Sequence, residues 1–253
     1  MIQQQIGIIL IGDELLNGSR KDKHMEKVIE LLKVRGLSLS WARIIGDTQQ
    51  EIVATLAQTI PSNDVVFSFG GIGATPDDLT RASAAKAFGL NLTRHPEATT
   101  LLEERFGENA YPNRILMADL PENSKLIPNP INQVPGFKVK HHHFVPGFPD
   151  MAWPMVEWVL EAYYQSLFNK HPDIEWRWDI FGVAESTLLG SMNELLESFP
   201  KVRLSSLPST IRRGDLIDFG LKGQEADVKK AAIWLEERLN HLEIDFKLRS
   251  TCN

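Results

Sequence analysis

The first 90 residues repeat one pattern three times, and this repeat limits the fold more than any other feature of the sequence. Apolar runs at 6–11, 39–45 and 65–69 have the composition of buried strands. Each is followed by a segment with apolar residues at helical spacing, such as Ile52 and Leu56. Alternating strands and helices predict a mainly parallel sheet with right-handed crossovers. The expected fold class is α/β, with three layers in the order α/β/α.

A second, smaller domain is predicted in the C-terminal third of the chain. Residues 169–173 read NKHPD, which is typical of a linker. Strand-like and helical segments then follow one another without a motif that indicates chemistry. We therefore expect a ligand-binding domain over residues 1–168 and a small α+β domain over residues 174–250.

Composition argues against several classes of protein. The net charge of the 253 residues is -6, which disfavours general electrostatic capture of nucleic acid. The N-terminal apolar stretch is too short for a signal peptide, and no run of about 18 apolar residues occurs, so we expect no membrane association. The single cysteine, Cys252, allows no internal disulfide bond. A cytoplasmic location is therefore predicted.

The stretch FSFGGIGATPDDLT at 67–80 places three glycines after the third strand and two aspartates behind them. Gly70, Gly71 and Gly73 can adopt positive φ and let main-chain N–H groups converge on an anion. The stretch is not a dinucleotide fingerprint, which needs glycine where Pro76 stands, nor a Walker loop, which needs a lysine. It predicts a phosphate-binding loop of another kind.

The aspartates of this stretch have two interpretations, which can hold together. Thr75 can cap a helix that starts at Pro76, and Asp77 and Asp78 then complement the positive end of the helix dipole. Alternatively, an aspartate holds Mg²⁺ or accepts hydrogen bonds from ligand N–H or O–H groups. Some such arrangement is needed because a carboxylate repels a nearby phosphate.

A second acidic cluster follows the first strand. Asp13 and Glu14 come directly after it, and Asp22 lies at the start of the first predicted helix. Ligands of parallel sheets bind at the carboxyl ends of the strands, so we expect this cluster and the glycine loop to share a cleft. The structural alternative is helix capping for Asp22 and a solvated turn for Asp13 and Glu14.

These motifs resemble a known family. GDELLNG at 12–18, RIIGDTQQEI at 43–52 and above all GGIGATPDDLT at 70–80 resemble the competence/damage-inducible protein A (CinA) group of the MoaB/Mog molybdopterin-binding superfamily. Further segments also resemble this group, namely NPINQVPGF at 129–137, VPGFPDMAWPM at 145–155 and FGVAEST at 181–187. The resemblance covers roughly residues 5–245.

The resemblance implies a domain that binds a small phosphorylated pterin or nucleotide, with molybdopterin as a candidate ligand. In some members it implies a pyrophosphatase that uses a divalent metal, Mg²⁺ or similar, and acts on ADP-ribose. The alternative is a non-catalytic binding module with a regulatory or assembly role, acting as a homo-oligomer. The group's amidohydrolase domain, which deamidates nicotinamide mononucleotide, is not matched in this sequence, so deamidation is not expected.

Family roles carry over only to matching positions. The expected catalytic residues are Asp78, Asp77 and Asp22, and the expected metal ligands are Asp13 and Asp78. The expected ligand-binding residues are Gly12, Asp13, Glu14, Asp47, Ser68, Gly70, Gly71, Gly73, Thr75, Thr80, Asn129, Pro146 and Gly147.

The chain departs from the group's pattern at three places. It has Asp-Lys-His at 22–24 where the group usually has Asp-Thr-Asn, and Ala74 replaces a proline. A glutamate expected near Met151 is not matched in register, although Asp150 is adjacent. The altered segment at 22–24 and the unmatched glutamate favour the non-catalytic alternative.

The histidines are not expected to bind a metal. Residues 141–143 are consecutive, and neighbours in a strand point to opposite faces, so their side chains cannot converge on one ion without a bend. We expect them to fill the structure, and we expect His24 to be a partly exposed side chain without a ligand role.

Overall fold

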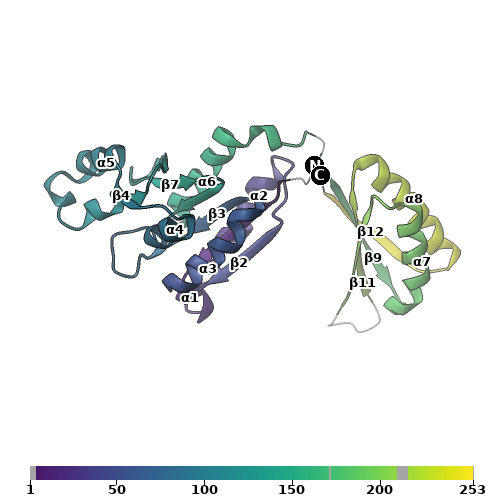
Figure 1. The fold of residues 1–253 in the computed structure, drawn as a ribbon. Helices are drawn as coiled ribbons and strands as arrows, with labels where there is room; N and C mark the ends of the chain where they lie inside the picture. Colours follow the sequence, from purple (N-terminus) through teal and green to yellow (C-terminus); the bar gives the residue numbers. More distant parts are fainter. Residues whose placement is uncertain (1–3, 171, 210–215, 253) are drawn as a thin grey trace. The chain divides into compact units, whose positions relative to one another are not determined.

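The computed structural model describes residues 4–170, 172–209 and 216–252. The chain divides into two compact units, Met1–Phe168 and Asn169–Asn253 (Figure 1). His171, in the predicted linker, lies outside the described residues. None of the helices in the described ranges has the length and apolar character that crossing a membrane requires.

The first unit is built on a six-stranded sheet with the strand order β2-β1-β3-β8-β7-β6. Its strands are β1 (Ile6–Ile11), β2 (Trp41–Ile45), β3 (Val65–Phe69), β6 (Lys125–Ile127), β7 (Gly136–Val139) and β8 (His142–Val145). The four strands β2, β1, β3 and β8 pair in parallel, whereas β7 and β6 are antiparallel to their neighbours. The prediction of a mainly parallel sheet is confirmed.

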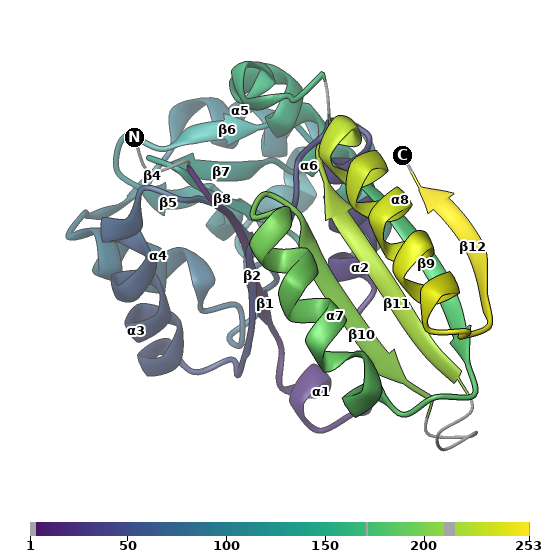
Figure 2. The same ribbon diagram turned by 90° about the vertical axis from the view of Figure 1, so that its right-hand side faces the viewer.

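Helices cover both faces of this sheet (Figure 2). Helices α2 (His24–Lys33) and α6 (Pro149–Tyr163) pack on one face, and α3 (Gln49–Thr59), α4 (Thr80–Phe88) and α5 (Pro96–Phe106) pack on the other. Side chains alternate along β1, so that Ile8 and Leu10 enter the first core while Ile9 and Ile11 enter the second. The predicted three-layer α/β/α architecture is confirmed.

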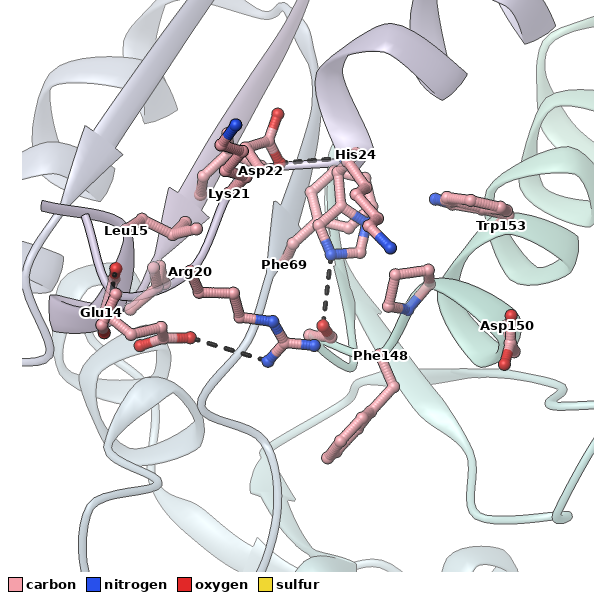
Figure 3. A pocket seen from close by; sticks show the side chains of 16 residues that line it. Glu14, Leu15, Arg20, Lys21, Asp22, His24, Phe69, Phe148, Asp150 and Trp153 are labelled. Atoms are coloured by element: carbon pink, nitrogen blue, oxygen red, sulfur yellow. Dashed lines mark hydrogen bonds and ion pairs between the residues drawn. The ribbon is translucent and has the colours of Figure 1, made fainter.

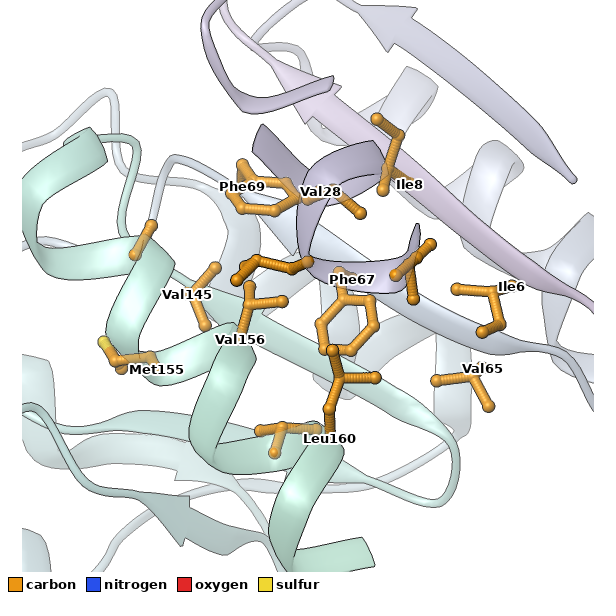
Figure 4. Packing of buried hydrophobic residues seen from close by; sticks show 14 of the residues in the cluster. Ile6, Ile8, Val28, Val65, Phe67, Phe69, Val145, Met155, Val156 and Leu160 are labelled. Carbon is orange, nitrogen blue, oxygen red and sulfur yellow. The ribbon is translucent and has the colours of Figure 1, made fainter. Parts of the chain in front are cut away.

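The core between the sheet and the helices α2 and α6 anchors the strands that end at the site. Phe67 and Phe69 of β3 pack there against Val28 of α2 and Val156 and Leu160 of α6 (Figure 4). All five side chains are nearly or fully buried. Burying such apolar side chains contributes about 1.5–3 kcal/mol each, so the strand ends are held rigidly.

Short elements complete the unit. They are α1 (Asp13–Leu16), β4 (Leu92–Arg94), β5 (Asp119–Pro121) and the 3-10 helices Ile60–Ser62, Gly107–Ala110, Arg114–Ala118 and Gln165–Leu167. Strands β4 and β5 form a separate two-stranded sheet.

Two of the three consecutive histidines fill the core of the first unit, as predicted. His142 and His143 of β8 are 2% and 0% exposed. The His142 Nε2 lies 2.9 Å from the Thr59 Oγ1, and the His143 Nδ1 lies 3.1 Å from the main-chain oxygen of Val66. Burial lowers the pKa of His142 to about 4 and that of His143 to about 3, so both are neutral at pH 7.

The second unit is a four-stranded antiparallel sheet with two helices, which confirms the predicted small α+β fold. Its strands are β9 (Ile174–Phe181), β10 (Arg203–Pro208), β11 (Leu216–Gly223) and β12 (Phe246–Cys252), in the order β10-β11-β9-β12. Helices α7 (Glu185–Ser198) and α8 (Glu225–His241) cover one face of the sheet (Figure 2). Strand β12 was not predicted.

Candidate functional site

The glycine loop, residues 70–75, lines a cavity of about 510 Å³ at the carboxyl ends of β1, β3 and β8. We call this cavity the glycine-loop cleft. Eleven of the expected site residues line it: Glu14, Asp47, Gly70, Gly71, Gly73, Thr75, Asp77, Asp78, Asn129, Pro146 and Gly147. The glycine loop and an acid from the chain's first turn therefore do share one cavity.

The main-chain N–H groups of residues 71–74 are the most distinctive feature of the loop. In the described part of the chain, none of the four has a hydrogen-bond acceptor. The two ends of the loop are fixed, because the Gly70 N–H donates to the Val145 carbonyl (3.0 Å) and the Thr75 N–H donates to Asp78 (2.9 Å). A run of unpaired amides on a fixed loop is an arrangement that binds anions.

Gly70 can be replaced only at a cost. Its φ is 103°, and a Cβ at this position would lie 2.6 Å from the carbonyl oxygen of Ile11. We expect Gly70→Ala to lower the free energy of unfolding by about 2 kcal/mol, measured by chemical denaturation, because strain and collision add. Gly89→Ala is the matched control, since Gly89 has a φ of 67° but no atom within 4 Å of the new Cβ, and about 1 kcal/mol is expected. Equal losses would contradict the importance of the close approach to Ile11.

A buried arginine lies behind the loop. Arg81 of α4 is 8% exposed and donates to the main-chain oxygens of Gly73 (2.7 Å), Asp119 (2.9 Å) and Leu116. Burial lowers the pKa of its guanidinium, and the negative charges of Asp119 and Asp78 oppose this shift. Arginine nevertheless stays protonated in proteins. No carboxylate of the described residues forms an ion pair with it. The positive charge under the loop therefore favours an anion on the free amides.

Two acids tie together the loops on the other side of the cleft. The Asp13 N–H donates to the Asp47 Oδ2 (2.9 Å), and the Asp47 N–H donates to the Asp13 Oδ1 (3.2 Å). Burial raises the pKa of Asp47, as do the charges of Asp13, Glu14 and Asp77, and the hydrogen bond from Asp13 opposes them. This side of the cleft therefore presents acceptors, which suit N–H or O–H groups of a ligand.

One of the two interpretations of this stretch, a helix cap at Thr75, is wrong. Helix α4 begins at Thr80, four residues after Pro76. The helix starts late because Thr80 is used to hold the loop: its N–H donates to the Gly71 carbonyl and its Oγ1 to the Gly70 carbonyl, both at 2.9 Å. Thr75 instead donates its N–H and its hydroxyl to the Asp78 Oδ2, at 2.9 and 2.5 Å. Asp78 thus closes the end of the loop.

Four expected ligand-site residues do not line the glycine-loop cleft. Ser68 is fully buried inside the sheet. Only the end of a buried strand borders the cleft, so the hydroxyl of Ser68 does not reach a ligand. Thr80 is buried under the loop, and Gly12 and Asp13 lie next to the cleft. Asp22 caps α2, since its carboxylate accepts from the N–H groups of His24 (2.8 Å) and Met25 (3.0 Å).

The residues of the cleft do not form a ready set of metal ligands. The Asp13 Oδ1 and the Asp78 Oδ2, the expected ligands, already accept hydrogen bonds from Asp47 and Thr75. Among residues 4–170, 172–209 and 216–252, no group of three or more His, Cys, Asp or Glu side chains could hold a metal ion. In the described structure these two carboxylates act as hydrogen-bond acceptors, and their binding of a divalent ion stays a prediction.

A second cavity of about 560 Å³ adjoins the cleft (Figure 3). It is lined by Leu10, Ile11, Glu14, Leu15, Ser19, Arg20, Lys21, Asp22, Lys23, His24, Phe69, Gly147, Phe148, Pro149, Asp150 and Trp153. The expectation of a partly exposed His24 is wrong, because this side chain is 6% exposed. Its ring stacks on Phe69 at 4.4 Å, and its Nε2 lies 3.2 Å from the Gly147 carbonyl oxygen.

Sequence reasoning missed Arg20, Arg81 and the second cavity. The sequence does contain a signal for Arg81. At helical spacing it shares a face with Ala84 and Ala85, and a charged residue on an apolar helix face is rarely buried without hydrogen-bond or ion-pair partners. Nothing in the local pattern of Arg20 marks it as part of a site.

Comparisons with known proteins agree with the resemblance. A family model described as "Probable molybdopterin binding domain" matches residues 7–165. A CinA-like protein of Syntrophotalea carbinolica is 34% identical over 188 residues, which are 71% of this chain and 46% of that protein. Another, of Geotalea uraniireducens, is 35% identical over 164 residues, 62% of this chain and 39% of that protein. The chain spans less than half the length of these two relatives.

A solved structure extends the comparison to the fold. The crystal structure of the protein CinA from Thermoplasma acidophilum matches with a TM-score of 0.57 and 25% identity, over 62% of this chain and 98% of that chain. The family match spans the six-stranded sheet from Gly7 onward, the glycine loop and all of α6. The chain therefore belongs to the family of the molybdopterin binding domain and is similar to CinA-like proteins.

Proposed function

We propose that the first unit binds a small phosphorylated ligand of the pterin or nucleotide class, molybdopterin among them, in the glycine-loop cleft. The observation that carries this proposal is the run of unpaired main-chain N–H groups at residues 71–74 with the buried Arg81 behind it. Phosphate oxygens are strong acceptors for such amides. The family's description as a molybdopterin binding domain supports the same class of ligand.

The acidic side of the cleft selects the organic group that is attached to the phosphate. Asp47 and Asp77 line it. Ionised carboxylates only accept hydrogen bonds, as the N–H groups of a pterin or the hydroxyls of a ribose require. Asn129 is only 5% exposed and uses its amide within its own loop, through Val134 and Ile131. Its role in this proposal is to shape the wall of the cleft.

A pyrophosphatase acting on ADP-ribose is the second candidate. It is favoured by Asp47, a carboxylate with a raised pKa at the edge of the anion site, because a general base with a raised pKa suits activation of water. Incubation of ADP-ribose with the protein, with and without Mg²⁺, decides between the two functions. Release of AMP and ribose phosphate supports the enzyme, and saturable binding without turnover supports the binding module.

Native mass spectrometry of the purified protein tests the proposal most broadly. We expect an adduct with the mass of a phosphorylated pterin or nucleotide, and saturable binding of AMP or ADP-ribose in calorimetry. The same spectrum tests the predicted homo-oligomer. Absence of any adduct, together with no binding of AMP, ADP-ribose or a pterin phosphate, would contradict the proposed function.

A further inference from the structure

Helix α2 exposes apolar side chains on the flank that faces away from α6. The buried Val28 packs toward the sheet, and Lys27 lies over the ring of Trp153 in α6, 5.8 Å from the ring centre. Met25 and Ile29 are one turn apart and lie on the opposite flank from Lys27. They are 42% and 44% exposed. This flank is therefore apolar and accessible.

The same flank borders the edge strand of the sheet. Strand β2 is the outermost strand on this side. Its side chains alternate, and because Trp41 and Ile45 pack against the core under α3 and α4, Ile44 points to the side of α2. Ile44 is 48% exposed, so α2 leaves the edge strand uncovered. We call Met25, Ile29 and Ile44 the α2 patch.

Two charged side chains flank Ile29 along the helix. Glu26 precedes it by three residues and Lys33 follows it by four, so both lie beside it on the exposed surface. Neither forms an ion pair within the ranges that the structure describes, whereas Lys27 and Glu30 pair with each other at 2.8 Å. The exposed surface of α2 thus has a free negative charge, an apolar centre and a free positive charge in sequence.

This order of charges is complementary to itself. When two copies of α2 pack antiparallel about a two-fold axis at Ile29, each Ile29 meets its counterpart, and Glu26 of each copy lies beside Lys33 of the other. A parallel arrangement would instead place like charges together, which is unfavourable. The two-fold axis repeats each contact, so the ion pair forms twice. A different partner would need an acid and a base at the matching spacing, which a second copy already has.

We propose that the α2 patch, with Glu26 and Lys33, forms the interface of a homodimer in which two copies of α2 pack antiparallel around Ile29. Met25 and Ile44 extend the apolar contact on both sides of the axis. The proposed interface is independent of the function proposed above, because none of these five side chains lines the glycine-loop cleft or the second cavity.

Charge reversal tests the proposed dimer, with the dimer Kd measured by sedimentation velocity of the full chain over a range of concentrations. Glu26→Lys places lysines opposite each other at both contacts, and Lys33→Glu places glutamates there. We expect each variant alone to dimerise about tenfold more weakly than the wild type, equivalent to about 1.4 kcal/mol. An equal mixture of the two variants should restore the dimer, because each contact then joins a lysine to a glutamate.

Two further variants separate the interface from effects on the helix itself. Glu97→Lys is the matched control, since Glu97 is also an exposed acid in the first turn of a helix, α5, and it should leave the dimer Kd unchanged. Ile29→Asp removes the apolar centre and should weaken the dimer by more than about tenfold. Circular dichroism and urea unfolding check that each variant is folded.

Three results would overturn the proposed interface. They are a wild-type chain that stays monomeric at the highest concentration measured, folded variants that dimerise as tightly as the wild type, and a mixture of Glu26→Lys and Lys33→Glu that dimerises no better than either alone. Loss of ligand binding or turnover in the glycine-loop cleft would leave these measurements unaffected, so the two proposals fail separately.

Discussion

Arg81→Met is expected to destabilise the first unit by about 4 kcal/mol, because three hydrogen bonds from a charged donor to buried carbonyls are lost. Methionine keeps the unbranched stem of the side chain but removes the charge and all donors. The lost partners are the main-chain oxygens of Gly73, Asp119 and Leu116. Urea unfolding measures the change in free energy.

The same substitution should weaken pyrophosphate binding about tenfold, because the positive charge behind the amides is removed. Arg81→Lys separates the two effects. It keeps the charge and loses the forked donation, so stability should fall while pyrophosphate affinity stays closer to that of the wild type. Calorimetry on each folded variant gives the affinities.

The matched control for Arg81 is Arg94→Met. Arg94 forms an ion pair with the side chain of Asp119 at 2.5 Å, but its own side chain is 41% exposed. Surface pairs of this kind contribute less than about 1 kcal/mol. Similar losses of stability and of pyrophosphate affinity in the Arg81→Met and Arg94→Met variants would contradict a special role for the buried arginine.

Acidification from pH 7.5 to pH 5 is expected to cost the first unit about 4 kcal/mol of stability. Burial lowers the pKa of His142 to about 4 and of His143 to about 3, whereas an unfolded histidine titrates near 6.5. The unfolded chain therefore binds more protons below pH 6.5, so stability falls as the pH drops. At pH 5 each histidine contributes about 2 kcal/mol to the loss. The loss stops growing below pH 4 for His142 and below pH 3 for His143.

Urea unfolding of His143→Gln at both pH values isolates one of the two contributions. The variant is expected to be less stable at pH 7.5, but its further loss on acidification should be smaller than that of the wild type by about 2 kcal/mol. His241→Gln, at an exposed position of α8 in the second unit, should leave the wild-type loss unchanged. An unchanged loss in His143→Gln would show that the buried histidine does not set the acid sensitivity.

The fold could be predicted from residues 6–69 because each element there has a local signal. The apolar run Ile6–Ile11 and the Thr48 cap, which accepts the N–H of Glu51 in the structure, are such signals. Strand β12 was missed because its sequence, FKLRSTC, has little apolar alternation. Strand β12 pairs with β9, which lies far from it in the sequence, so its formation depends on a distant partner.

The site could be predicted only in part, for a similar reason. The glycines at 70, 71 and 73 predict a loop with an unusual backbone conformation, and this loop does line a cleft. The interpretation of Thr75 and Pro76 as a helix cap was wrong, because their local pattern is that of a cap whereas Thr80 bonds to the carbonyls of Gly70 and Gly71 and holds the loop. The second cavity arises from segments far apart in the chain, which local pattern does not encode. Arg81 does have a local signal, its place on a helix face with Ala84 and Ala85, but its acceptors at Leu116 and Asp119 are distant in the sequence.

In the proposed function, the free main-chain amides of residues 71–74 bind the anionic group of the ligand. Amide-resolved NMR of the isotope-labelled protein, titrated with inorganic pyrophosphate, tests it directly. The largest ¹H and ¹⁵N shift changes should fall on Gly71, Ile72, Gly73 and Ala74, and they should saturate with one affinity. Saturable changes that leave these four amides unmoved would contradict the claim.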